Sequence, residues 1–524
     1  MENKQDLSNN PTIQQYNVVK QNYTPEEKIL LNEIRENLVD LAISSGENFQ
    51  TDEVKLLNDI KVFLFNRLGD KNQNNNISNE YLDKLSHKVL RDIIGYGKID
   101  SLLQDDELEE IMIIGINKPV FVYHRKYGMM KTNITYDDEQ ELTDLIDSMA
   151  RQINRRIDKE SPILDGRLSD GSRINATIPP VSADGPSLTI RKFKKDPLTI
   201  IDLINSKTIS VELAAFLWLC IDGLGVKSAN AIISGGTSSG KTTTLNALTS
   251  FINPKERIIT IEDTLELQIP HEHIIRMETR PSNVENKGEL TMNDLVKNSL
   301  RQRPDRIIVG EVRAQEAITL FTALNTGHSG FGTLHSNSAR ETITRLTTEP
   351  MSVPKIMIQA IDFIIMQKRI YTPTGVSYRR ISEVAEIVGS EEGVIQLNKI
   401  FEWNPESDTI ENVSISSKTL SQIANLSGKS LYEINKEIES REMVLKYMIN
   451  HNIHSEDDVK GILELYYANP QKVLNRIVLN RWYYFQKIFY CSWRDILAFS
   501  EFIEKPVPER HYPQKRRWKK GIGL

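Results

Sequence analysis

Eight consecutive residues in the middle of the chain have the spacing of a loop that binds phosphate groups. They fit the pattern G-x-x-x-x-G-K-[ST] and are Gly235, Gly236, Thr237, Ser238, Ser239, Gly240, Lys241 and Thr242. Glycines let the backbone curl so that successive N–H groups point at a β-phosphate, and a following helix adds its positive N-terminal end. We expect Lys241 to neutralise the β- and γ-phosphates, the Thr242 hydroxyl to bind Mg²⁺, and Thr243 to join the nucleotide-binding set.

The residues around this loop favour function over a chance turn rich in glycine and serine. The apolar run from Ala231 to Ser234 precedes the loop, and a helical run from Thr243 to Leu248 follows it. This strand–loop–helix order is the context that phosphate binding requires.

A second chemical feature is an acidic residue that follows an apolar run. Ile307, Ile308 and Val309 read as a buried strand, and Gly310 and Glu311 follow them. An acid at the carboxyl end of such a strand lies in the usual ligand crevice of a parallel sheet. We expect Glu311 to polarise an attacking water or to hold Mg²⁺ through water. The alternative is a surface acid after a core strand.

The run Ile259 to Ile261 repeats this logic, because Glu262 and Asp263 follow it. Two carboxylates at the same edge of a sheet can order water around a metal ion. We therefore place Glu262 and Asp263 among the catalytic residues. The alternative is a solvated strand end.

Two of the nine histidines, His328 and His335, fall within one glycine-rich stretch. A lone histidine is usually a satisfied core residue, but the pair favours a polar site that senses the γ-phosphate. A metal site is disfavoured because no third ligand of the usual type lies at ligand spacing.

The elements that must position these residues alternate between strands and helices from about Thr199 onward. Strands separated by helices predict a parallel sheet with crossover connections, and therefore an α/β fold. The expected strands are Ala231–Ser234, Arg257–Glu262, Arg306–Val309 and Gly332–His335.

The rest of the chain predicts further parts around this domain. Residues 79–198 mix strands and helices and read as a separate α+β domain, with strands at 120–124, 131–136, 167–180 and 187–193 and helices at 82–94 and 139–157. Residues 199–410 form the P-loop domain, which ends in an antiparallel pair at 383–388 and 394–403. Residues 1–78 begin flexibly and then turn helical from Thr24. Residues 411–524 are mostly helical up to 478 and end in an aromatic and basic tail.

Composition excludes several classes of protein. The net charge is −6, which gives no bulk attraction to nucleic acid or to an acidic membrane. Cys220 and Cys491 are too few for a disulfide framework or a four-cysteine zinc site. The N-terminus lacks the apolar core of a signal peptide, and the most apolar runs are far shorter than the roughly 20 residues of a membrane span. We expect a cytoplasmic protein that a partner holds at the membrane.

These blocks, in this order, resemble the secretion ATPases of type II and type IV secretion, type IV pili and archaeal surface filaments. The family's Walker A, Asp box, Walker B and His box match Gly235–Thr242, Glu262–Asp263, Gly310–Glu311 and the two histidines, and the stretch Leu295 to Arg313 is especially similar. The resemblance spans roughly residues 80–400. It is nearest to the branch of Tad-type pilus and archaeal filament motors, and this chain lacks the zinc module of the type II branch.

The resemblance implies a RecA-like ATPase domain that uses ATP and Mg²⁺, and a homohexamer. It implies that Arg173 and Arg191, in the preceding domain, reach the γ-phosphate, since an arginine fork binds phosphate oxygens in pairs. Arg276 and Arg280 also match family arginines, without an assigned role. An integral-membrane platform protein would couple the motion to the assembly of pilus-like subunits or to secretion.

Two other functions compete with this reading. A nucleic-acid translocating or segregating ATPase would share the sheet, but the acidic balance and the absence of a long basic stripe disfavour it. The basic tail, Tyr512 to Lys520, could bind nucleic acid or anionic lipid, although most short charged tails are simply solvated. A scaffold that binds ATP without turnover is disfavoured by the presence of Lys241, Thr242 and Glu311.

Overall fold

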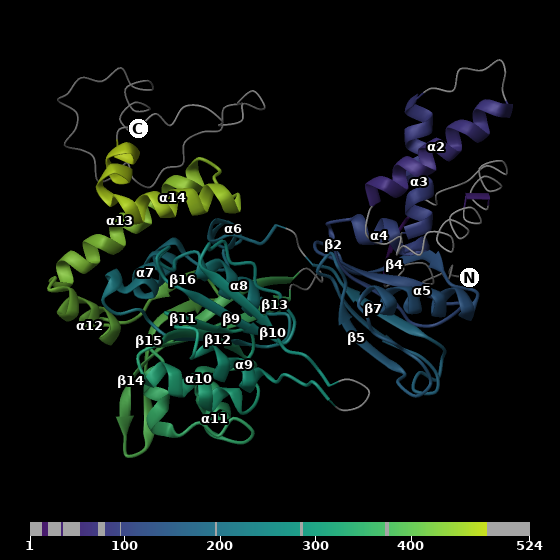
Figure 1. Cartoon of the computed structure of the whole chain (residues 1–524). Helices are drawn as coiled ribbons and strands as arrows, with labels where there is room; N and C mark the ends of the chain where they lie inside the picture. The colour runs from purple at the N-terminus through teal and green to yellow at the C-terminus, as the bar shows by residue number, and fades with distance from the viewer. Residues whose placement is uncertain are drawn as a thin grey trace, which may run out of the picture. The chain divides into compact units, whose positions relative to one another are not determined.

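The computed structural model describes residues 13–18, 33–34, 53–71, 79–94, 96–193, 196–282, 287–371 and 377–478. These residues form two compact units that divide between residues 195 and 196 (Figure 1). The division into four parts drawn from the sequence, with limits at 78, 198 and 410, is finer than this one and stays a prediction. The aromatic and basic tail after residue 478, including Cys491, lies outside the described residues.

The first unit contains a pair of helices, α2 (Glu53–Lys71) and α3 (Asn79–Ile94). Leucine and isoleucine side chains from both helices, together with Ile34, form a small core of their own. The helix predicted over 82–94 is confirmed. Most of the apolar positions predicted between Thr24 and Ile43 lie outside the described residues.

A seven-stranded sheet in the order β1-β4-β3-β2-β7-β6-β5 forms the rest of this unit. One face packs against α5 (Glu139–Gln152) through Leu142, Ile146 and Met149. The strands and short helices are η2 (Gly97–Ile99), α4 (Asp100–Gln104), β1 (Gln14–Tyr16), β2 (Leu108–Ile113), β3 (Pro119–His124), β4 (Gly128–Thr135), β5 (Ile163–Arg167), β6 (Arg173–Thr177) and β7 (Ser187–Arg191).

The strand predicted over 167–180 is wrong in one respect, because the range includes the turn between two antiparallel strands, β5 and β6. β5 ends at Arg167 and β6 begins at Arg173, and the chain turns at Gly171, whose φ of 93° suits glycine. The Asp170–Gly171 pair is an ordinary turn signal that the longer strand prediction overlooked.

The second unit contains a nine-stranded sheet in the order β10-β9-β11-β12-β8-β13-β14-β15-β16. The first six strands of this order, from β10 through β9, β11, β12 and β8 to β13, run parallel to their neighbours. The predicted α/β fold is therefore confirmed. The parallel strands are β8 (Ala231–Gly235), β9 (Ile258–Glu262), β10 (Ile274–Glu278), β11 (Arg306–Val309), β12 (Ser329–Leu334) and β13 (Phe363–Tyr371).

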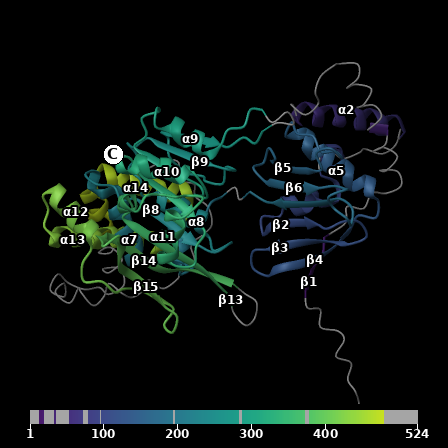
Figure 2. The same ribbon diagram turned by 90° about the horizontal axis from the view of Figure 1, so that it is seen from below.

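Helices cover both faces of this sheet, as Figures 1 and 2 show. Neighbouring strand residues alternate between the two cores, so that Ile308 joins one and Ile307 the other. Side chains in a strand point to opposite faces in turn, and a strand buried on both faces is apolar throughout. The helices are α6 (Ile200–Asn205), α7 (Val211–Asp222), α8 (Lys241–Thr249), α9 (Met292–Ser299), α10 (Glu316–Asn325) and α11 (Ala339–Thr347), with the short turns η3 (Gly223–Gly225) and η4 (Lys355–Ala360).

An antiparallel extension and three helices complete the unit. The extension is β14 (Ser377–Glu391), β15 (Val394–Asn404) and β16 (Thr409–Asn412), and its predicted antiparallel pairing is confirmed. The predicted helical region contains α12 (Lys418–Ser427), α13 (Leu431–Asn450) and α14 (Glu456–Ala468).

A buried ion pair anchors these last helices to α7. Arg441 of α13 and Asp222 at the end of α7 lie 2.6 Å apart, and each side chain is 3% exposed. The Arg441 guanidinium also lies against the rings of Trp218 and Tyr466. The anchor therefore joins three helices at one point inside the unit.

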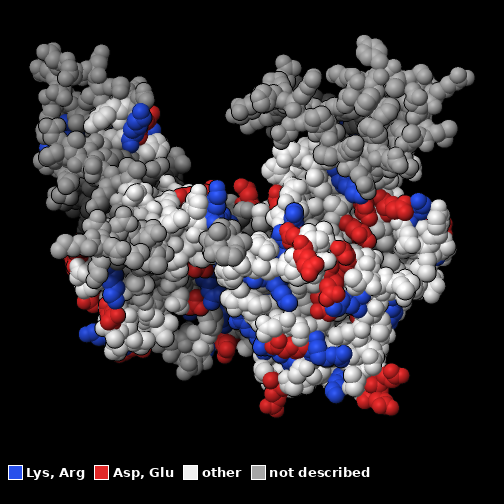
Figure 3. Space-filling model, turned by 180° about the vertical axis from the view of Figure 1, so that it is seen from behind, with Lys and Arg blue, Asp and Glu red and all other residues white. Residues whose placement is uncertain are grey.

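On the described surface in Figure 3, lysine and arginine side chains are interspersed with aspartate and glutamate. This mixture agrees with the nearly balanced composition. None of the described helices combines the length and the apolarity needed to cross a membrane.

Candidate active site

The glycine-rich loop joins the end of β8 to the start of α8, as the sequence predicts. All five residues of β8 are buried. Gly240, at the N-terminus of α8, has a φ of 95°, a conformation that side chains rarely adopt. A Cβ atom on Gly235 would lie 2.2 Å from the Gln367 carbonyl oxygen of β13. Both glycines are therefore required by the backbone itself.

Lys241 lies inside the curve of this loop. Its Nζ donates to the carbonyl oxygens of Gly235 and Gly236 at 3.0 and 2.9 Å. The side chain is 7% exposed, and burial lowers the pKa of Lys241, with Glu311 acting against that effect. A cation held in this way is ready to exchange backbone oxygens for phosphate oxygens.

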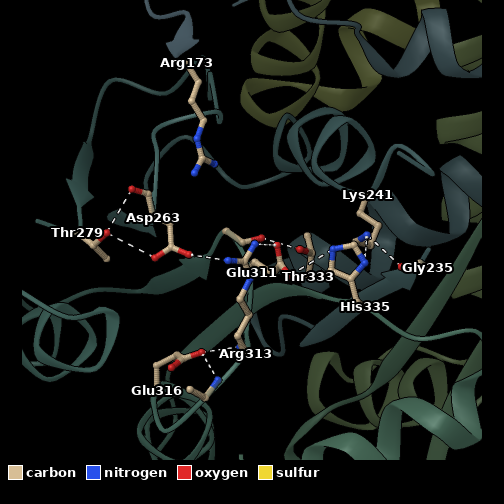
Figure 4. Close-up of polar contacts among 12 residues, drawn as sticks. Arg173, Gly235, Lys241, Asp263, Thr279, Glu311, Arg313, Glu316, Thr333 and His335 are labelled. Carbon is tan, nitrogen blue, oxygen red and sulfur yellow. Dashed lines mark hydrogen bonds and ion pairs between the residues drawn. The ribbon is translucent and has the colours of Figure 1, made fainter. Parts of the chain in front are cut away.

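His335 links Lys241 to Glu311 (Figure 4). The Lys241 Nζ lies 3.3 Å from His335 Nδ1, and His335 Nε2 lies 3.4 Å from Glu311 Oε1. Burial and the charge of Lys241 lower the pKa of His335, which favours the neutral ring. In that form Nδ1 accepts from Lys241 and Nε2 faces the carboxylate as a donor. Residues that follow β8, β11 and β12 in the chain thus meet at one edge of the sheet.

Arg313 is a residue of this edge that the sequence analysis did not assign. Its Nη2 donates to Glu311 Oε2 at 2.6 Å, and its Nη1 lies 3.3 Å from Asp263 Oδ2. Burial alone would raise the pKa of Glu311, but the bond and charge of Arg313, with His335 and Lys241, lower it overall. The signal in the sequence was an arginine two residues after the acid, on the same loop.

Glu262 and Asp263 follow the same strand but have opposite environments. Glu262 is 2% exposed, and its Oε2 accepts the backbone N–H groups of Glu266 and Leu267 at 2.8 and 2.9 Å. Its Oε1 has no hydrogen-bond partner, and burial raises the pKa of Glu262 to about 7. The Asp263 side chain is 44% exposed. The Asp263 side chain therefore lies at the edge of the sheet, where it contacts Arg313. The Glu262 side chain instead holds the backbone that follows β9.

The two predicted histidines lie at opposite ends of one strand. His328 precedes β12, and His335 follows it. Seven steps along the strand at ~3.3 Å each separate their backbones by about 23 Å. His328 Nδ1 contacts the Ala323 carbonyl oxygen at 3.2 Å, near the end of α10. Within one chain the structure brings only His335 to the loop, and the role of His328 stays a prediction.

The four predicted arginines lie in three places. Arg276 on β10 donates to the Leu267 carbonyl oxygen at 2.8 Å, and Arg280 donates to that of Gly288 at 2.7 Å. Arg173 and Arg191 belong to the first unit, where they are register partners on β6 and β7. Arg173 also lies 3.0 Å from Asp165.

The residues at the edge fit Mg²⁺ bound together with a phosphate ligand. Among the described residues there is no group of three His, Cys, Asp or Glu side chains that could hold a metal ion alone. Mg²⁺ usually takes one or two protein oxygens plus phosphate oxygens and water. Thr242, at the start of α8, and Glu311 supply oxygens of the required kind.

Comparisons with known proteins show what this chain is similar to. Residues 97–425 match the family described as "Type II/IV secretion system protein". Protein MJ0781 of Methanocaldococcus jannaschii is 33% identical over 77% of this chain and 79% of its own length. The conjugal transfer protein TrbB of Rhizobium radiobacter is 33% identical over 58% of this chain and 90% of its own length. The solved structure of the ATPase DotB from Yersinia pseudotuberculosis is 19% identical, covers 70% of this chain and 92% of its own, and has a TM-score of 0.41.

The family match covers more than half of the chain, including the glycine-rich loop, both acidic strand ends and His335. The chain therefore belongs to the type II/IV secretion system family and is a P-loop ATPase that binds nucleotide.

Proposed function

We propose that this protein is the ATP-hydrolysing motor of a pilus-like filament or of a secretion apparatus, and that it works through a membrane platform protein. The observation that carries the proposal is the meeting of Lys241, His335 and Glu311 at one edge of the parallel sheet. Hydrolysis requires a group that binds the phosphates and a group that activates water. Lys241 and Glu311 are groups of these two kinds.

Each residue of this edge has a role in the proposed reaction. The loop Gly235–Thr242, with Thr243, binds the triphosphate, and Lys241 neutralises the charge that develops on its terminal phosphate. Glu311 accepts hydrogen bonds from the attacking water and orients it. His335 lies between Lys241 and Glu311, and burial and the charge of Lys241 lower its pKa, so that it can respond to the terminal phosphate. Thr242 and Glu311 would hold Mg²⁺, which would supply positive charge beside the phosphates.

The remaining predicted residues extend the proposal beyond one chain. Asp263 would order water near the metal. Glu262 would act indirectly, since its carboxylate holds the backbone that follows Asp263. Arg173 and Arg191 would supply positive charge to the γ-phosphate, and the protein would work as a homohexamer. The kinship to proteins named for conjugal transfer and secretion supports a role in moving macromolecules across a membrane.

The first experiment replaces the lysine. Lys241→Ala should reduce ATP turnover by at least about 100-fold, because a preorganised charge at the developing phosphate is lost. Phosphate release by the purified protein measures this. Turnover at the wild-type rate would contradict the proposed role of the loop.

A second measurement separates the motor classes. The filament or secretion motor should respond to the cytoplasmic part of a membrane platform protein encoded beside its gene. A many-fold rise of ATP turnover with single-stranded DNA would instead favour a nucleic-acid motor.

A further inference from the structure

Arg313 joins two carboxylates that end neighbouring strands of the sheet. We propose that Arg313 is a positioning residue, which fixes the Glu311 carboxylate by tying it to Asp263; this inference rests on the proposed function. The contacts are those of a planar fork, with Nη2 on Glu311 at 2.6 Å and Nη1 on Asp263 at 3.3 Å (Figure 4). Different nitrogen atoms serve the two acids, so both contacts exist at once.

The strand order makes such a tie necessary. Strands β9 and β11 are parallel neighbours, with Val309 in register with Ile261, so the acids that follow them come out at the same edge. Two carboxylates in that position repel each other. A guanidinium between them removes the repulsion and fixes the direction of each side chain. A lysine, whose ammonium group is a point charge, cannot reproduce both contacts with the same geometry.

The backbone of Arg313 is itself held in place. Glu316 Oε1, at the start of α10, accepts the N–H groups of Arg313 and Ala314 at 2.5 and 2.7 Å. Glu316 is 5% exposed. The loop after β11 is therefore anchored, and the arginine projects from a fixed point.

Exposure argues that the role of Arg313 concerns geometry more than stability. The Arg313 side chain is 60% exposed, and ion pairs of this kind contribute little to folding. Groups that orient a catalytic ligand nevertheless affect activity strongly when they are removed. Arg313 fits that description, because it touches Glu311 but has no other assigned part in the reaction.

The test compares five variants with the wild type. Arg313→Gln should lower kcat by about 10- to 100-fold, as loss of an orienting partner does. The Kd of a fluorescent ATP analogue should change by less than about threefold, because the phosphate grip remains. Arg313→Lys should fall between wild type and Arg313→Gln. Arg345→Gln is the matched control, since Arg345 lies near His335 electrostatically but pairs with Glu341 on α11, and it should leave kcat within about twofold.

Asp263→Asn, alone and combined with Arg313→Gln, tests whether the contact between Arg313 and Asp263 matters for turnover. If Arg313 acts through Asp263, the combined loss of kcat is smaller than the product of the two single losses. Wild-type kcat in Arg313→Gln, or losses that multiply independently, would overturn the inference. Absence of ATP turnover in the wild type would instead overturn the proposed function, so the two failures are distinguishable.

Discussion

Two arginine–carboxylate pairs in the second unit have the same chemistry and opposite surroundings. Arg441 and Asp222 lie 2.6 Å apart with both side chains 3% exposed. Arg313 and Glu311 are also 2.6 Å apart, but their side chains are 60% and 21% exposed. Distance alone therefore does not reveal what a pair does. The buried pair fixes helices, whereas the accessible pair lies where a ligand can reach it.

The electrostatics separate the two pairs in the same way. Burial raises the pKa of Asp222 despite its arginine, whereas the partners of Glu311 lower its pKa despite partial burial. An acid that must remain charged for chemistry needs charged partners at a site that a ligand can reach. An acid that holds helices together tolerates a dry environment, because nothing has to enter or leave.

The largest expected effect is the loss of the buried pair. Arg441→Ala should lower the free energy of unfolding by about 3–5 kcal/mol, because Asp222 would remain buried without its partner. Urea denaturation of the purified protein measures this. Lys446→Ala on the same helix is the control, since its exposed pair with Glu442 contributes at most about 1 kcal/mol. Equal changes in the two variants would show that burial does not distinguish them.

A smaller effect on the free energy of unfolding concerns Glu262, the buried acid at the end of β9. The folded-state pKa of Glu262 is raised to about 7, so its contribution to stability is complete below the unfolded pKa of about 4.5 and is lost as pH rises through 7. The wild type should therefore lose about 1 kcal/mol between pH 6 and 8 that Glu262→Gln does not lose. Denaturation midpoints at the two pH values test this. Parallel pH profiles for both proteins would refute the shift.

The smallest effect on folding should come from the accessible pair. Arg313→Gln should change the free energy of unfolding by less than about 1 kcal/mol, because both partners stay hydrated. The same denaturation experiment measures it beside Arg441→Ala. A loss as large as that of Arg441→Ala would mean that Arg313 is a structural anchor, and the comparison would fail.

Much of the ATPase unit could be predicted from short sequence signals. The run Ala231–Ser234 and the glycine-rich loop specify a strand, a turn and a helix, and β8 and α8 have that order. The acids after β9 and β11 were also placed correctly at one edge, since parallel strands end together. These are local patterns whose geometry is almost independent of the rest of the chain.

What sequence could not supply was orientation and burial. Glu262 and Asp263 are adjacent, yet successive side chains diverge at a strand end, and only the fold decides which one is enclosed. His328 and His335 look close in sequence, but a whole strand lies between them. Arg313 was overlooked because its importance depends on the neighbouring strand that brings Asp263 within reach.

The most direct test of the central claim is to measure nucleotide binding and ATP turnover in one variant, Glu311→Gln. Because the amide keeps the shape of the side chain but cannot act as a carboxylate, turnover should fall by about 10²- to 10⁴-fold while a fluorescent ATP analogue still binds. Hydrolysis at the wild-type rate would contradict the assignment of Glu311, and with it the account of this edge as the site of ATP hydrolysis.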